Sequence, residues 1–174
     1  MTIDQIIREG TSQVKTTFCS FQANIMSIEN KREPYYNACK KCYSKVDMKE
    51  GVVECYKCKK IDVECNQRYI LKLIVTDGEQ SIKITIFDDS EMLIGCPVSE
   101  YMSMNGEKDM QSKFNRNLIS CVGKKYEFYT KANKISEDDR AMGRWIAQYI
   151  ERIDDVEHED INKDDGCQNK RRKL

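Results

Sequence analysis

Four cysteines in two Cys-x-x-Cys pairs, separated by twelve residues, constrain this chain more than any other feature. The pairs are Cys39 with Cys42 and Cys55 with Cys58, and Gly51 lies between them. Two such pairs can turn four thiolates toward one point, and Zn²⁺ favours a tetrahedral set of sulfur ligands. Four sulfurs leave no position for water or substrate, so the pattern predicts one structural zinc ion rather than a catalytic one. The alternative is four unrelated structural cysteines.

The other cysteines bear on the cellular compartment. The chain has 174 residues and nine cysteines, but its first residues, Met-Thr-Ile-Asp-Gln, contain neither a basic nor an apolar signal region. We therefore expect a reduced intracellular protein whose remaining cysteines pack as small buried side chains. Cys65 is close enough to the quartet to be a substitute ligand, although core packing is favoured. No apolar run reaches membrane-spanning length, so no membrane partner is expected.

Charge is balanced over the whole chain but not along it. Lys and Arg number 29, as do Asp and Glu, which gives no general argument for nucleic-acid binding. Residues 39–60 nevertheless hold seven lysines against three acids, whereas residues 151–165 hold eight acids against two bases. The basic segment is suited to phosphate contacts, and the acidic one is typical of a solvated tail. The basic run at 170–173 is similar to a nuclear import signal.

Hydrophobic patterning predicts a helix and then a strand-rich region. Thr2 and Gln5 have the spacing of a capping box, which predicts a short helix ending at Gly10. Residues 16–28 alternate between apolar and polar side chains, as in a half-buried strand. The zinc segment, at about 34–66, follows as an insertion.

Two further strands, 68–76 and 81–87, flank a turn at Asp77-Gly78 and predict a hairpin. Helical patterns cover 89–104 and 107–122, the second ending at Gly123. The last two strands are expected at 124–134 and 143–153.

The predicted order is therefore five strands with helices between the third and fourth. This order indicates a mainly β fold, a five-stranded OB-fold barrel with an inserted zinc ribbon between strands 1 and 2. We expect one folded domain at 1–153 and a polar, flexible tail at 154–174.

Motifs in this order resemble a known family. They are Ala38-Cys39-x-x-Cys42, Gly51-Val-Val-Glu-Cys55-x-x-Cys58, Arg68-Tyr-Ile-Leu-Lys-Leu-x-Val-x-Asp77 and Ile84-Thr-Ile-Phe87. Together they look like the C-terminal DNA-binding domain of the replication protein A large subunit, over about residues 16–153. The resemblance implies an OB-fold with a zinc ribbon that binds single-stranded DNA and has little chemistry of its own.

The resemblance also implies binding residues. Phe87 matches a position where the family stacks an aromatic ring on a base; the alternative is that Phe87 closes one end of the barrel. Lys83 stands where the family often has a second aromatic, so we expect basic side chains to carry more of the affinity through phosphates. The candidates are Lys72, Lys83, Lys125, Lys131, Lys134 and Arg68, each of which could equally be an ordinary solvated residue. Tyr129 alternates with the apolar residues of its strand and is a second stacking candidate.

The C-terminal residues depart from the family pattern. In replication protein A an apolar helix after the fifth strand assembles three subunits, but residues 154–174 contain only Val156, Ile161 and Leu174 as clearly apolar side chains. This departure suggests a specialised paralogue, and the Lys- and Asn-rich composition is compatible with the replication-protein-A-like subunit of a ciliate telomerase. We therefore expect a nuclear protein, at chromosomes or telomeres, whose partners are single-stranded DNA and other subunits of a replication or telomerase complex.

Two other classes of function are weighed. A protein-interaction OB domain, which docks a replication or telomerase complex with little DNA binding of its own, is favoured by the zero net charge, the missing aromatics and the acidic tail. An enzyme has little support, because the single histidine, His158, lies in the acidic tail and no glycine-rich phosphate loop is present. The pairs Asp88-Asp89 and Asp138-Asp139 are adjacent and would point apart in a strand. We expect no small-molecule substrate.

Overall fold

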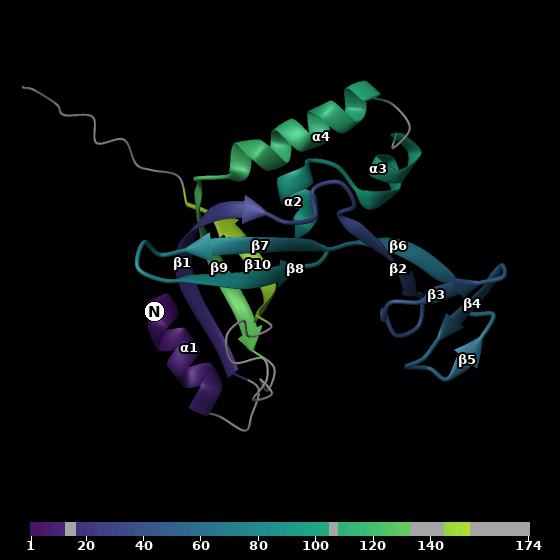
Figure 1. Ribbon diagram of the computed structural model, residues 1–174, viewed down its shortest axis with the longest axis horizontal. Helices are drawn as coiled ribbons and strands as arrows, with labels where there is room; N and C mark the ends of the chain where they lie inside the picture. Colours follow the sequence, from purple (N-terminus) through teal and green to yellow (C-terminus); the bar gives the residue numbers. More distant parts are fainter. Residues whose placement is uncertain (13–16, 105–107, 133–144, 154–174) are drawn as a thin grey trace, which may run out of the picture.

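Five strands form a closed barrel at the centre of the molecule (Figure 1). The computed structural model describes residues 1–12, 17–104, 108–132 and 145–153. Around the barrel the order is β1-β7-β8-β10-β9, in which only the pair β8–β10 is parallel. The bounds are β1 Thr17–Ile28, β7 Leu71–Thr76, β8 Ser81–Ile86, β9 Lys125–Ala132 and β10 Trp145–Arg152. The prediction of an OB-fold barrel is confirmed.

The side chains of the barrel strands alternate between the buried interior and the outer face. Along β7 and β8 every second side chain is buried, and the six that point inward are all aliphatic: Leu71, Leu73, Val75, Ile82, Ile84 and Ile86. Phe21 of β1 stacks on Phe128 of β9 inside the barrel, with ring centroids 5.6 Å apart. A pleated strand sends successive side chains to opposite faces, so the intervening residues face outward and are available for a ligand.

Helix α1 (Ile3–Ser12) covers one end of the barrel and confirms the predicted capping box. The Thr2 N–H donates to Gln5 Oε1 (2.9 Å) and the Gln5 N–H donates to Thr2 Oγ1 (3.2 Å). The helix passes the expected stop at Gly10, because a glycine costs only about 1 kcal/mol inside a helix. Ile3, which is fully buried in the core, anchors it.

The segment between β1 and β7 leaves the barrel as a separate lobe (Figure 1). Its stem pairs β2 (Tyr35–Cys39) with β6 (Cys65–Tyr69), and its tip holds β3 (Asp47–Lys49), β4 (Val52–Cys55) and β5 (Lys60–Ile61).

The strand expected at 68–76 is divided at Ile70, where the stem meets the barrel. The Ile70 N–H donates to the Pro34 carbonyl (2.8 Å), and the Asn30 amide bridges the Ile70 carbonyl (2.8 Å) and the Lys72 N–H (2.9 Å). These bonds satisfy the backbone where it turns from one sheet into the other.

The helices between β8 and β9 correct one prediction. The single helix expected at 89–104 is two helices, α2 (Ser90–Ile94) and α3 (Val98–Met104). Gly95 caps α2 in the left-handed region, at φ 92°, and Pro97 follows before the chain can continue the helix. Helix α4 (Lys108–Cys121) confirms the second helix, with Phe114 and Leu118 buried. Within the described ranges, no helix has the length and apolar character needed to cross a membrane.

Candidate metal centre and nucleic-acid interface

The four cysteines of the two pairs meet in the inserted lobe. The Sγ atoms of Cys39, Cys42, Cys55 and Cys58 all lie within 4.8 Å of one another. Cys39 Sγ is 3.9 Å from Cys58 Sγ, and Cys42 Sγ is 3.5 Å from Cys55 Sγ. Zinc–sulfur bonds of about 2.3 Å place tetrahedral sulfurs about 3.8 Å apart, so this donor set fits one Zn²⁺.

Each pair is shaped by the residue that follows it. Tyr43, after Cys42, has φ 60°, and Lys59, after Cys58, has φ 53°. The Tyr43 N–H donates to the Cys39 carbonyl (2.8 Å), which closes the first turn. A residue in the left-handed region therefore follows each cysteine pair.

The thiols of this set have opposite pKa shifts. Hydrogen bonds from the side chain and backbone of Ser44 lower the pKa of Cys42 to about 6. The sulfur of Cys42, followed by burial, raises the pKa of Cys58 to about 12. Four thiols this close together resist the loss of all four protons, so the binding of a metal ion here would be coupled to proton release.

Cys65 lies outside this set. It lies opposite Cys39 in the β2–β6 ladder and packs against the small cluster formed by Val46, Cys39 and Cys55. This position agrees with the packing role favoured for Cys65 over that of a substitute ligand.

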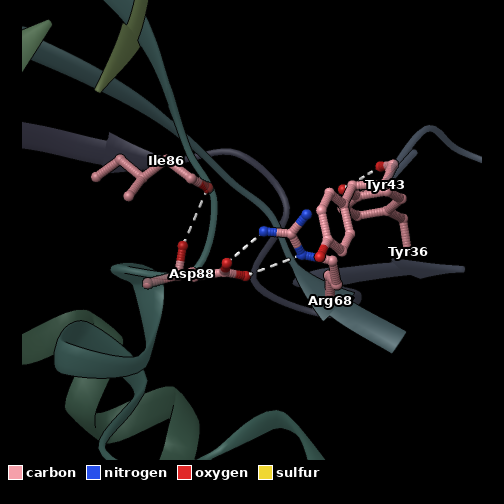
Figure 2. A network of polar contacts seen from close by, with 6 residues as sticks. Tyr36, Tyr43, Arg68, Ile86 and Asp88 are labelled. Atoms are coloured by element: carbon pink, nitrogen blue, oxygen red, sulfur yellow. Dashed lines mark hydrogen bonds and ion pairs between the residues drawn. The ribbon is translucent and has the colours of Figure 1, made fainter. Parts of the chain in front are cut away.

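A second feature lies where the lobe meets the barrel (Figure 2). Here a cleft of about 440 Å³ is lined by side chains from β2, β6 and β10, from the turn after Cys42 and from the segment that follows β8. The lining residues are Tyr36, Tyr43, Arg68, Phe87, Asp88, Asp89, Ala147 and Gln148. Three aromatic rings therefore surround one cleft beside the candidate metal centre.

Arg68 is the centre of the polar contacts in this cleft (Figure 2). Its Nε donates to Asp88 Oδ1 at 3.2 Å, and a second nitrogen forms an ion pair with Asp88 Oδ2. Its guanidinium carbon lies 4.5 Å from the centroid of the Tyr43 ring. The hydrogen bond to Asp88 raises the pKa of Arg68, so the guanidinium stays charged.

The aromatic rings are ordered by the same contacts. The Tyr36 hydroxyl donates to the Tyr43 carbonyl (2.9 Å), and the Tyr36 ring meets the Phe87 ring edge-on at 6.1 Å. Burial raises the pKa of Tyr36, although the nearby Arg68 opposes this shift. Tyr36 thus remains a neutral hydrogen-bond donor.

Phe87 and Arg68 are the two predicted binding residues that the structure brings together in the cleft. Phe87 is half-buried and does not belong to the hydrophobic core, so its ring faces the cleft rather than closing the barrel. Lys72 and Lys83 lie on the outer face of β7 and β8. Lys72 is exposed, whereas Lys83 Nζ forms an ion pair with Glu29 at 2.9 Å.

The other candidates lie on β9. Tyr129 faces outward, 38% exposed, with its ring centroid 5.5 Å from that of Tyr149. Lys131 Nζ lies 5.8 Å from the Phe18 ring centroid. Lys125 is six residues from Lys131, about 20 Å along a strand.

The three candidates on β9, Lys125, Tyr129 and Lys131, form a second surface and do not line the cleft. Glu127 and Glu151 are directly paired beside the two tyrosines and make this part of β9 and β10 more acidic. Lys134 lies outside the described residues.

Sequence reasoning missed Tyr36, Tyr43, Asp88 and Tyr149. Tyr43 directly follows the first cysteine motif in the sequence, but only the packing of the lobe on the barrel brings its ring to Arg68. The pair Asp88-Asp89 lies in the turn before α2 rather than in the expected strand, and its carboxylates bind different partners. Asp89 Oδ2 accepts from the Ile150 N–H (3.2 Å), while Asp88 binds Arg68.

A closed five-stranded barrel, with a four-cysteine lobe between its first two strands, defines this protein as an OB-fold domain. Residues 18–161 match the family model described as "Replication factor-A C terminal domain". The chain belongs to this family.

Named relatives agree with the match. The chain is 26% identical over 142 residues to a 70 kDa DNA-binding subunit of replication protein A from Arabidopsis thaliana, and the alignment covers 80% of this chain and 24% of that relative. The chain thus spans about a quarter of the length of this curated relative.

Two solved structures show the same fold. "Structure and Conformational Change of a Replication Protein A Heterotrimer Bound to ssDNA" gives a TM-score of 0.67 at 25% identity, covering 88% of this chain and 36% of that one. "Yeast RPA bound to ssDNA" gives 0.64 at 25% identity, covering 90% and 89%.

Proposed function

We propose that the protein binds single-stranded DNA through the aromatic cleft between the lobe and the barrel, without catalysing a reaction. In this proposal one structural zinc ion, held by Cys39, Cys42, Cys55 and Cys58, fixes the lobe, and the domain works in the nucleus within a larger nucleoprotein complex. The family match and the two structures named for bound single-stranded DNA support this assignment.

The observation that carries the proposal is the position of Phe87. An apolar ring that stays outside the core, in a cleft with two tyrosines, is suited to stacking with an unpaired base. Every base has a flat π-face, so such stacking tolerates any sequence. The exposed Lys72 on the neighbouring strand can contact the phosphate backbone.

The test is a fluorescence-anisotropy titration with a labelled thymine oligonucleotide of about 20 bases. Loss of one stacking ring in Phe87→Ala should weaken binding by about 5- to 150-fold, which corresponds to about 1–3 kcal/mol per stacked base. Ile119→Ala is the matched control, because it removes an exposed apolar side chain from α4. Absence of salt-sensitive binding by the unmodified protein would remove the proposal.

The narrower telomeric role is part of the same proposal. It rests on the resemblance and on the polar composition of residues 154–174. Titrations with a telomeric repeat, a scrambled strand and a poly-thymine strand of equal length test it. Tighter binding of the repeat supports telomeric work with telomerase subunits as partners, and equal binding of all three strands supports general replication work.

A second candidate is a protein-interaction domain with little DNA binding of its own. The ion pairs that occupy Arg68 and Lys83 favour it, because they leave less positive charge for phosphate. Unchanged DNA affinity in Phe87→Ala, together with loss of complex assembly after changes on the helices, would select this function.

A further inference from the structure

Arg68 differs from the other basic candidates in that both oxygens of one carboxylate, that of Asp88, bind its guanidinium. Both Asp88 oxygens bind the guanidinium, one from Nε and one from a terminal nitrogen (Figure 2). Paired donors in this arrangement are the same fork that a phosphate would use. The Arg68 side chain is only 22% exposed, whereas the Asp88 side chain is 65% exposed. A phosphate that approaches from solvent therefore reaches the Asp88 carboxylate before the Arg68 guanidinium.

The flat face of the Arg68 guanidinium also has a partner, the Tyr43 ring. Its guanidinium lies over the Tyr43 ring, and the Tyr43 carbonyl accepts the hydroxyl hydrogen bond of Tyr36. Tyr36 in turn meets Phe87 edge-on. Arg68 is thus joined to three neighbours: Asp88 at the end of β8, Tyr43 in the lobe and, through it, the ring that contacts Phe87.

We propose that Arg68 is a positioning residue of this cleft: Asp88 and Tyr43 clamp its guanidinium, which holds Tyr43 in place and, through the Tyr43 carbonyl, holds the Tyr36 ring against Phe87, without contacting a phosphate. The inference rests on the proposed function, and it changes the role expected for Arg68 from the sequence. It also gives Asp88 a role, which is to withhold the positive charge of Arg68 from the DNA backbone.

Salt dependence separates the two roles. Each phosphate contact of a single strand adds about 0.7 to the slope of log affinity against log salt concentration. We therefore expect Arg68→Gln to weaken binding about tenfold, as for the loss of one well-placed stacking ring, and to leave the slope unchanged. Lys72→Gln is the control, because loss of a phosphate contact should make the slope shallower by about 0.7. Melting curves confirm that each variant is folded.

Two further variants keep the proposal testable if Arg68→Gln does not fold. Arg68→Lys retains the charge but lacks the planar fork, so we expect it to bind weakly as well. Asp88→Asn should free Arg68 for the backbone and steepen the slope by about 0.7.

Three results would overturn the inference. They are a shallower salt slope in Arg68→Gln, a DNA affinity of Arg68→Lys equal to that of the unmodified protein, or a salt slope of Asp88→Asn equal to that of the unmodified protein. Salt-independent behaviour of the unmodified protein is a different outcome, because it would remove the proposed function itself.

Discussion

Removal of zinc should unfold the inserted lobe and leave the barrel folded. The lobe has a very small core: Val46 is buried with Cys39 and Cys55, and only a few partly buried side chains pack around them. Full burial of one valine contributes about 1.5–3 kcal/mol. Structural zinc in small finger peptides contributes about 10–16 kcal/mol. The metal should therefore dominate the stability of the lobe, whereas the barrel and the helices packed on it share a core that contains 25 of the described residues and none of the four cysteines.

Hydrogen exchange read by mass spectrometry can measure this difference, before and after treatment with a chelator. We expect amides of residues 39–65 to lose protection and those of β1, β7 and β8 to keep it. DNA affinity should fall as a consequence, because Tyr43 and Arg68 belong to the lobe and its stem.

Two serine variants form a matched pair for this experiment. Cys58→Ser should lower the bound zinc and expose the lobe, whereas Cys65→Ser should keep one zinc per chain, since Cys65 lies outside the ligand set. Full protection of the lobe in protein shown by elemental analysis to be metal-free would refute the reasoning.

Two predictions concern stability. Burial acts to raise the pKa of Asp77, but hydrogen bonds from backbone N–H groups, including that of Ile3, outweigh it and lower this pKa. The ionised carboxylate therefore stabilises the fold above its ordinary pKa of about 3.9. The difference in melting temperature between the unmodified protein and Asp77→Asn should be full at pH 6 and shrink as the pH falls below about 4; a constant difference would contradict this. Gly95→Ala should lower the free energy of unfolding in urea by about 1–3 kcal/mol, because φ is 92° and a Cβ would lie 2.7 Å from Asn117 Nδ2. Gly78→Ala has a similarly positive φ but nothing within 4 Å, so an equal loss there would show that the Asn117 contact contributes nothing.

The barrel and its first helix could be predicted because the sequence patterns that specify them are local. Alternation in β7 and β8 is regular, and the reciprocal bonds of Thr2 and Gln5 need only three residues of separation. The break between α2 and α3 was missed because the apolar pattern continues past Gly95, although Gly95 followed by Pro97 is a helix stop signal that the sequence contains.

The site was only partly predictable, for a different reason. Phe87 and Arg68 lie in motifs that the resemblance identifies, yet the partner of Arg68 is twenty residues away on another strand end. The sequence gives the charge of a basic side chain but does not show whether a carboxylate forms an ion pair with it. Tyr43 likewise has no pattern of its own, because its position follows from the turn after Cys42.

The lobe also has a consequence for how quickly the barrel can assemble. Strands β1 and β7 are neighbours, but residues 29–70 separate them. Once the stem has paired Tyr35 with Tyr69, the free chain between the strands is about five- to sixfold shorter, which lowers the entropy cost of bringing them together by about 1.5 kcal/mol. A metal ion bound early would therefore speed barrel closure by up to about tenfold, and stopped-flow refolding with and without zinc would reveal it.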